Sequence, residues 1–260
     1  MRIKRVSENK YAAYDEDFNR VGTCTVRRRE LSRIFPDRPV QYEIIVNCNE
    51  ESRYLLWGAA VTRARMLAES QRLPSRVYTC LSPENSEERQ ILTDLGFTET
   101  DMIIRAVKPV TDEQVNLPIP YGCTIVRDYL TNENEIRKCL TRYNECFGTN
   151  ESRSWLIGLS EKPDFARILM VSPDELCGEL MVWRSGKNGV IGIIQTARKW
   201  REKGVAGYLI EDARKYFATM DLENILFDVW LASPGCKELA RSSGFKKGSI
   251  IELRPEILIG

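Results

Sequence analysis

The chain has 260 residues, 43% of them hydrophobic, and its 38 Lys and Arg residues balance 37 Asp and Glu residues. A net charge of +1 excludes a strong overall field that steers the protein toward nucleic acid or anionic lipid. The eight cysteines form no CxxC pair and histidine is absent, so we expect no metal site and no histidine chemistry. No apolar run is long enough for a membrane helix, which predicts a cytoplasmic protein with reduced thiols.

A polar connector divides the sequence into two halves that are each rich in periodic apolar residues. Pro109, Pro118 and Pro120 resist both helix and central strand, so we predict domains at 1–108 and 121–260 with a linker at 109–120.

The second half predicts an α/β (α+β) domain, a mixed, mostly antiparallel sheet flanked by helices. Asn132 opens a helix, apolar runs broken by turns follow as a meander, and the period changes to helical from Lys203. A helix that leads from one strand to the next implies one crossover beside the sheet. The expected elements are a strand at 123–129, helices at 132–147 and 151–159, a meander at 166–197, a helix at 203–217, a strand at 224–233, a helix at 236–244 and a strand at 249–254.

The segment "REKGVA", residues 201–206, lies where that long helix begins. A helix start presents backbone N–H groups without intrahelical partners and a partial positive charge, so it attracts anions. Gly204 and Ala206 leave room for a phosphate, and Arg201 and Lys203 add charge-assisted contacts. The alternative is a charged, solvated loop of the kind found on many surfaces.

The second half resembles the GNAT superfamily of N-acetyltransferases. "REKGVA" fits the family's pyrophosphate loop, Arg/Gln-x-x-Gly-x-Gly/Ala, and "LARSSGF", residues 239–245, is similar to its later "LYxxxGF" segment. The first half resembles a shorter copy of the same domain, with strands within 10–28 and at 40–47, and a helix at 53–70. Its "NCNEESRY" carries Glu50 and Glu51 where the anion loop belongs, and these would repel a pyrophosphate. We therefore expect a scaffold or lid that shields the second domain, with a second active site as the alternative. This half begins too late to contain the family's leading strand and first helices.

The resemblance implies that the second domain binds acetyl-CoA or another acyl-CoA as co-substrate. A fourth-strand segment lines the pantetheine arm in the family, and its backbone N–H groups polarise the acyl carbonyl. Carried over residue by residue, the pyrophosphate contacts are Arg201, Lys203, Gly204, Val205 and Ala206, and the strand segment is Ile194, Gln195 and Thr196.

Several positions depart from the family pattern. Ala240 stands where many members have a tyrosine acid, Ser233 replaces an asparagine, and Glu202 fills a loop position that is often small. Glu179 and Asp228 are the candidate bases on strands near the cofactor, and for each the alternative is an exposed or ion-paired strand residue.

Tyr143, Phe147 and Trp155 fall in the helical region that forms the acceptor wall in the family. Helical spacing makes Tyr143 and Phe147 core candidates as well.

Two functions follow from the resemblance. The first is transfer of an acetyl group from acetyl-CoA to a primary amine of a small molecule, an amino acid or a peptide. The second is a catalytically silent GNAT-like protein that binds CoA thioesters or a protein partner, which the loss of the tyrosine favours. Neither function involves a nucleic acid or a membrane.

Overall fold

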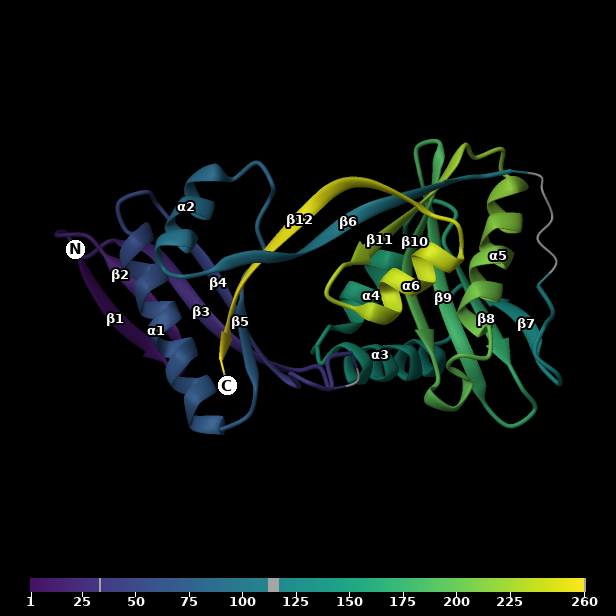
Figure 1. Ribbon diagram of the computed structural model, residues 1–260, viewed down its shortest axis with the longest axis horizontal. Coiled ribbons are helices and arrows are strands. Elements are labelled where there is room, and N and C mark those ends of the chain that lie inside the picture. The colour runs from purple at the N-terminus through teal and green to yellow at the C-terminus, as the bar shows by residue number, and fades with distance from the viewer. Residues whose placement is uncertain (33, 112–116, 260) are drawn as a thin grey trace. The chain divides into compact units, whose positions relative to one another are not determined.

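The computed structural model describes residues 1–32, 34–111 and 117–259 (Figure 1). The chain forms two compact units, the first made of Met1–Ile103 with Ile250–Gly260, and the second of Ile104–Ser249. The strands belong to one mixed, mostly antiparallel sheet of 12 strands, and each unit contains part of it together with its own helices.

The first unit places one long helix against an antiparallel set of strands. Strands β1 to β4 pair in sequence, β5 is parallel to β4 because helix α1 carries the chain across between them, and β12 is antiparallel to β5. The strand order is β1-β2-β3-β4-β5-β12-β6. The elements are β1 (Arg2–Ser7), β2 (Lys10–Tyr14), β3 (Arg20–Glu30), β4 (Val40–Cys48), α1 (Arg53–Gln71), β5 (Ser75–Tyr78), α2 (Ser86–Asp94), β6 (Thr98–Pro109) and β12 (Lys246–Ile259).

Strand β1 corrects one expectation from the sequence. The first unit does have a leading strand, which pairs with β2 through a tight turn at residues 8–9, so the prediction that this strand is missing was wrong. The sequence of β1 shows no clear alternation of apolar and polar residues. Ile3 packs against the core, whereas charged residues occupy most of the other positions. Basic residues are typical of an edge strand, where they discourage pairing with other chains.

The core of this unit lies between α1 and β3, β4 and β5. Tyr42, Ile44, Leu56, Trp57 and Val77 are all at most 1% exposed. The even-numbered residues of β4 face this core because successive side chains of a strand alternate between its faces.

The second unit has the arrangement predicted from its sequence. Strands β7 to β10 form the antiparallel meander, and β11 is parallel to β10 after the crossover of α5. The strand order is β6-β11-β10-β9-β8-β7. Asn132 caps α3 as expected, with its side chain accepting the N–H groups of Asn134 and Glu135. The elements are β7 (Thr124–Asp128), α3 (Glu133–Phe147), α4 (Arg153–Ser160), β8 (Ala166–Val171), β9 (Leu176–Ser185), β10 (Asn188–Thr196), α5 (Val205–Ala218), β11 (Asn224–Trp230) and α6 (Pro234–Ser242).

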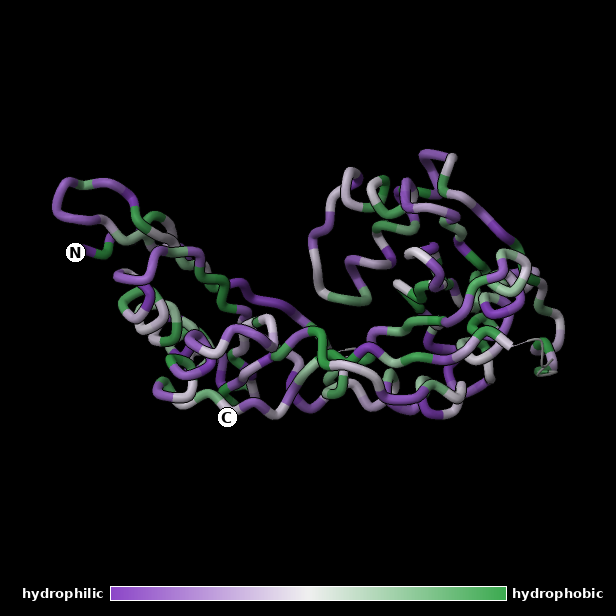
Figure 2. The backbone as a smooth tube through the Cα atoms, turned by 90° about the horizontal axis from the view of Figure 1, so that it is seen from above, coloured by the Kyte–Doolittle hydropathy of each residue, from purple (hydrophilic) through white to green (hydrophobic). Residues whose placement is uncertain are grey.

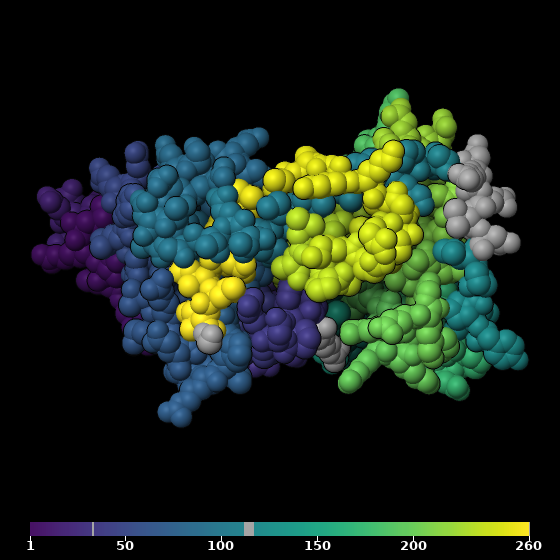
Figure 3. Space-filling view, viewed as in Figure 1, coloured from purple at the N-terminus to yellow at the C-terminus, as the bar shows by residue number. Residues whose placement is uncertain are grey.

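Helices cover both faces of the sheet in the second unit. Met181 and Ile193 pack with α3 and α4 on one face. Gly178, three residues before Met181 on β9, lies against Val205 and Leu209 of α5 on the other face. Helix α6 lies at the surface of the unit, near the yellow end of the colour scale in Figure 3.

The unit boundaries fall inside two long strands. Residues 104–109 of β6 belong to the second unit, where β6 neighbours β11, and residues 250–259 of β12 belong to the first, where they pair with β5. The sequence places the boundary at residue 108 and a linker at 109–120. Residues 112–116 of that linker lie outside the described residues.

Hydrophobic and hydrophilic residues are interspersed along the whole backbone (Figure 2). Within the described parts of the chain, no helix combines the length and the apolar character needed to cross a membrane.

Candidate functional site

The ladder between β10 and β11 stops halfway along β10. Parallel pairing runs only from Asn188–Asn224 to Ile191–Phe227. Beyond that point β10 continues to Thr196 beside β9, and among these fully described residues it forms no further pair with β11. The backbone groups on this side of Ile194, Gln195 and Thr196 therefore have no strand partner, and they can bind a ligand.

A β-bulge at Gly192 lies at the point where the ladder ends. The register of β10 against β9 shifts between Ile191 and Ile193, so Gly192 is the extra residue. The indole ring of Trp183 lies directly over Gly192, where the Cβ of any larger residue would overlap with it. Gly192 and Trp183 thus fix the position of the bulge.

The bulge also changes which face the following residues occupy. Before it, Gly189 packs against Phe217 of α5. After it, Ile193 packs into the core formed with α3 and α4. Because one extra residue reverses the alternation, Gln195 lies on the α3 and α4 face, directly opposite Glu179 of β9.

Helix α5 begins beside the open end of β10. Its N-cap residue is Gly204, with a φ of 79°, and no side chain caps the helix start. A Cβ on Gly204 would meet no atom within 4 Å, so space is available in front of the first N–H groups of the helix. Uncapped N–H groups with open space before them suit an anion.

Gly178 brings the strand end and the helix start together. A Cβ at this position would lie 2.7 Å from Cγ1 of Val205 and 3.0 Å from the carbonyl oxygen of Gln195. The absence of a side chain there allows α5 to approach the sheet closely. The end of β10 at Gln195 and Thr196 and the first residue of α5, Val205, therefore all lie next to Gly178. That these residues form one cofactor site stays a prediction.

Two basic residues of the loop before α5 are exposed. Arg201 and Lys203 form no ion pair within the described part of the chain, although the Nζ of Lys203 lies 4.9 Å from the ring centre of Trp200. Trp200 is itself held by Glu175, whose carboxylate accepts the indole N–H at 2.8 Å. Glu202 between the two cations has a left-handed backbone, with a φ of 63°. The loop thus offers unpaired positive charge beside the helix start.

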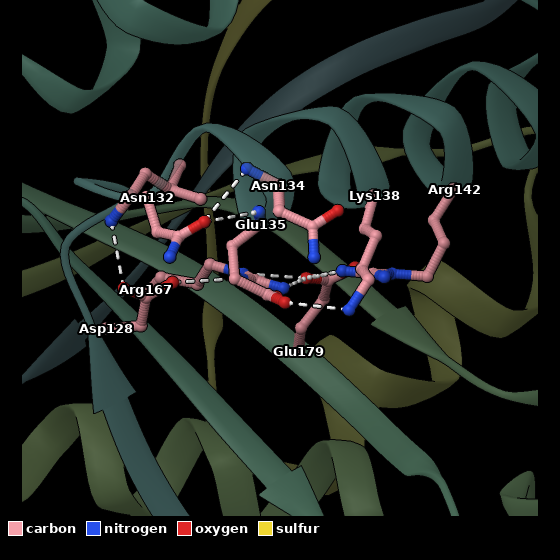
Figure 4. A network of polar contacts seen from close by, with 9 residues as sticks. Asp128, Asn132, Asn134, Glu135, Lys138, Arg142, Arg167 and Glu179 are labelled. Atoms are coloured by element: carbon pink, nitrogen blue, oxygen red, sulfur yellow. Dashed lines mark hydrogen bonds and ion pairs between the residues drawn. The ribbon is translucent and has the colours of Figure 1, made fainter.

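The predicted base Glu179 is fully buried and ion-paired (Figure 4). Arg142 donates from Nε to Oε1 at 2.9 Å and from Nη2 to Oε2 at 3.2 Å. Arg167 approaches Oε2 with Nε at 2.8 Å and Nη2 at 2.7 Å. Three of these contacts fall on Oε2 and one on Oε1, so both carboxylate oxygens of Glu179 are bound to arginine side chains.

The predicted base Asp228 is also paired. Arg105 of β6 donates from Nε to Oδ1 at 2.9 Å and from Nη2 to Oδ2 at 3.0 Å. This hydrogen bonding raises the pKa of the Arg105 guanidinium. Both carboxylates therefore fit the alternative interpretation from the sequence, an ion-paired strand residue.

The three aromatic residues of the expected acceptor wall form a cluster. The ring of Tyr143 lies 4.7 Å from that of Phe147 and 4.5 Å from that of Trp155, measured between centroids. All three pack against the core under α3 and α4. Their packing accounts for their helical spacing.

Comparisons of sequence alone find no relatives. No known family model matches the chain, and no curated protein is detectably similar to it in sequence.

Comparisons of structure do find relatives. A GCN5-related N-acetyltransferase from Anabaena variabilis matches 95% of this chain and 62% of its own, with a TM-score of 0.59 and 12% identity. A GCN5-related N-acetyltransferase from Sphaerobacter thermophilus matches 98% of this chain and 82% of its own, with a TM-score of 0.53 and 14% identity. A tandem GNAT protein from the clavulanic acid biosynthesis pathway matches 96% of this chain and 82% of its own, with a TM-score of 0.51 and 10% identity. This chain has the GNAT fold.

The GNAT fold gives Ala240 and Ser233 their places on α6. Ser233 is the N-cap residue of this helix and accepts the N–H of Cys236 at 3.4 Å. Ala240 is buried, 7% exposed, and its methyl group has no proton to donate. That Ala240 corresponds to the tyrosine of many GNAT proteins stays a prediction from the resemblance.

The sequence analysis missed the Gly192 bulge and the arginine partners of Glu179. A lone glycine inside an apolar strand pattern is a signal for a bulge, and "GVIGII" contains one. Arg142 and Arg167 gave no such signal, because they come from α3 and β8 and meet Glu179 only in the fold. Among the described residues, no three Cys, Asp or Glu side chains gather into a metal site.

Proposed function

We propose that this protein is an acyl-CoA-dependent N-acetyltransferase. It transfers the acetyl group of acetyl-CoA to a primary amine of a small molecule, an amino acid or a peptide. The observation that carries the proposal is that two features of the second unit lie next to each other. An uncapped helix start flanked by free cations lies beside a strand end that has lost its neighbour.

The residues present suit a CoA thioester. Arg201 and Lys203 would bind the pyrophosphate together with the N–H groups of Val205 and Ala206, and the open surroundings of Gly204 admit it. The unpaired backbone of residues 194–196 would bind the pantetheine arm. Bound there, the thioester supplies an activated acetyl group.

The backbone of residues 194–196 supplies most of the chemistry that the chain itself contributes. Attack of the amine nitrogen on the thioester carbonyl places negative charge on the carbonyl oxygen, and a fixed N–H donor stabilises that charge. The C–N bond forms as the C–S bond breaks, and the sulfur leaves as a thiolate. A thiol has a pKa of about 8.5, so the thiolate leaves without a side-chain acid and takes its proton from water or from the ammonium product. Ala240 is compatible with this route.

The amine must lose a proton before it attacks. Glu179 and Asp228 remain the candidate bases that the resemblance implies, and each would have to leave an arginine partner to act. Water reaching the exposed part of the site needs no such rearrangement. We therefore propose deprotonation by water as the default route, with Asp228, whose side chain is 38% exposed, as the carboxylate nearest to solvent.

Cofactor binding tests the proposal on the full chain. Arg201→Ala should weaken the affinity for acetyl-CoA by about 10- to 150-fold, the equivalent of ~1.5–3 kcal/mol for a charge-assisted hydrogen bond. Lys215→Ala is the matched control, because Lys215 is exposed in the last turn of the same helix. Titration calorimetry measures both variants, and equal affinities would contradict the proposal.

A second candidate function is binding of CoA thioesters without turnover. Ala240 and the ion pairs of Glu179 and Asp228 favour it, because neither a side-chain acid nor an unpaired base is present at these positions. Release of free thiol from acetyl-CoA in the presence of a panel of primary amines separates the two functions. Tight cofactor binding with no thiol release from any amine would support the silent protein.

A further inference from the structure

The side chain of Gln195 contains a buried donor with no partner. Its Nε2 is inaccessible to solvent and makes no hydrogen bond within the described residues. The bulge at Gly192 places Gln195 on the α3 and α4 face, whereas the uncapped start of α5 adjoins the opposite face. An unsatisfied buried amide destabilises the fold, and a ligand oxygen that accepts its N–H removes that cost.

Arg142 presents a second donor near Gln195. Gln195 and Glu179 are cross-strand partners, so their Cβ atoms lie about 4.5–5.5 Å apart. Arg142 holds Glu179 through Nε and Nη2, which leaves Nη1 without a hydrogen-bond partner in the described chain. The Arg142 side chain is 32% exposed, and its two bonds to a fully buried carboxylate fix its orientation.

The charges around Arg142 favour an anion rather than a cation. Arg167 and Arg142 neutralise Glu179, and Arg167 also binds Asp128 at 2.8 Å. Lys138 pairs with Glu135 at 3.1 Å on the same helix face, as Figure 4 shows. Every acid of this cluster thus has a basic partner, and no unpaired carboxylate opposes an incoming one.

We propose that Gln195 and Arg142 bind a carboxylate of the acceptor, so that the acceptor is a small aminocarboxylate. This inference rests on the proposed function. The carboxylate accepts one hydrogen bond from Nε2 of Gln195 and one charge-assisted hydrogen bond from Nη1 of Arg142. Its amine is then held on the α3 and α4 face of the unpaired segment 194–196. Gln195 and Arg142 are specificity-determining residues and take no part in bond making.

The test compares amino acids with their carboxamides as acceptors, using the full chain and Gln195→Leu. Wild type should prefer the amino acids, and Gln195→Leu should raise KM for them about tenfold, the equivalent of ~1.4 kcal/mol, because it removes one hydrogen bond to a charged group. The variant should raise KM for the amino acids more than KM for the carboxamides, because only the amino acids carry the carboxylate. Gln195→Glu should raise KM for amino acids further, because its charge repels the carboxylate. Equal changes for both acceptor classes, or no preference in wild type, would overturn the inference.

A binding measurement separates this inference from the proposed function. Calorimetry first titrates CoA into wild type and Gln195→Leu, and then titrates the amino acids and carboxamides into the CoA-loaded proteins. Equal CoA affinity with loss of amino acid binding in Gln195→Leu supports the inference even without turnover. Equal CoA affinity with unchanged amino acid binding refutes the inference alone. Absence of CoA binding in wild type refutes the proposed function and this inference with it.

Discussion

The two units place a helix after their fourth strand in two different ways. In the second unit, residues 197–204 form a long loop that leaves the start of α5 uncapped. In the first unit, residues 49–52 form a short loop, and groups of this loop accept the N–H groups of Ser52 and Arg53. Asn49 Oδ1 accepts the N–H of Ser52 at 3.1 Å, and the carbonyl of Glu50 accepts the N–H of Arg53 at 3.2 Å. Neither helix start has a side-chain cap, so the two units differ in the length of the loop and in the two cations, Arg201 and Lys203, that the longer loop carries.

The two units also differ where the parallel ladder of the fourth strand ends. In both units the parallel ladder ends after four residue pairs, at Glu43–Tyr78 in the first and Ile191–Phe227 in the second. In the first unit the hydroxyl of Thr79 donates to the carbonyl of Ile44 at 2.8 Å, just beyond the end of the ladder. No bulge interrupts β4 against β3. Both units therefore have a ladder of four pairs, and in these strands the bulge occurs in the second unit, in β10 against β9.

Each unit has a glycine in its third strand that lies against the long helix, so the helix packs at the same place in both units. Gly22 of β3 allows α1 to approach, since a Cβ there would lie 2.7 Å from Cδ1 of Leu56. Gly178 of β9 does the same for α5. The difference between the units thus lies in the loop and the strand edge, and the packing of the helix is retained.

The largest expected effect comes from cutting the second unit at the boundary that the sequence suggested. A fragment of residues 121–260 lacks residues 104–109 of β6, so β11 loses a neighbour and Asp228 loses Arg105. We expect this fragment to aggregate or remain unfolded, because it exposes a strand edge. A fragment of residues 98–260 is the control. Thermal unfolding of both fragments is monitored by circular dichroism. Equal thermal stability would contradict the role given to β6.

A smaller effect is expected from filling the bulge. Gly192→Ala places a methyl group where the ring of Trp183 lies, and overpacking of this kind lowers the free energy of unfolding by about 1–3 kcal/mol. It should also weaken acetyl-CoA binding, because the unpaired strand edge moves. Gly158→Ala on α4 is the control, since its Cβ would meet no atom within 4 Å. Denaturant unfolding of both variants measures the difference, and an unaltered Gly192→Ala protein would argue against the bulge as a fixed feature.

The ion pair of Asp228 predicts a modest effect on catalysis. Asp228→Asn should leave the acidic limb of the pH–rate profile in place, because water rather than this carboxylate removes the amine proton in the default route. The measurement is kcat/KM for the amine between pH 6 and pH 9, chosen to span the roughly 8.5 pKa of a thiol. Loss of the acidic limb in Asp228→Asn would instead identify Asp228 as the base.

The smallest effect is expected in the first unit. Adding positive charge through Glu50→Lys and Glu51→Lys should not create a second CoA site, because Asn49 and the backbone of Glu50 already bond with the N–H groups there. Calorimetry on the double variant should give the wild-type stoichiometry. A second binding event would show that charge alone separates the two units.

Local sequence signals predicted the second unit well. The period change at Lys203 and the glycine in "REKGVA" located the helix start, and Asn132 located the start of α3. Features that depend on distant residues were not predictable. The arginine partners of Glu179 come from two other elements. Residues 250–259 belong to the first unit although they follow the whole second unit in the chain. The face occupied by Gln195 depends on a one-residue bulge that reverses a regular alternation.

The stoichiometry and residue dependence of CoA binding test the central claim most directly. Titration calorimetry on the full chain should show one molecule of acetyl-CoA bound per chain. The double variant Arg201→Ala, Lys203→Ala should lose this binding, since both cations of the open helix start are removed. Two sites per chain, or undiminished affinity in the double variant, would contradict the claim that the second unit alone binds the cofactor at this loop.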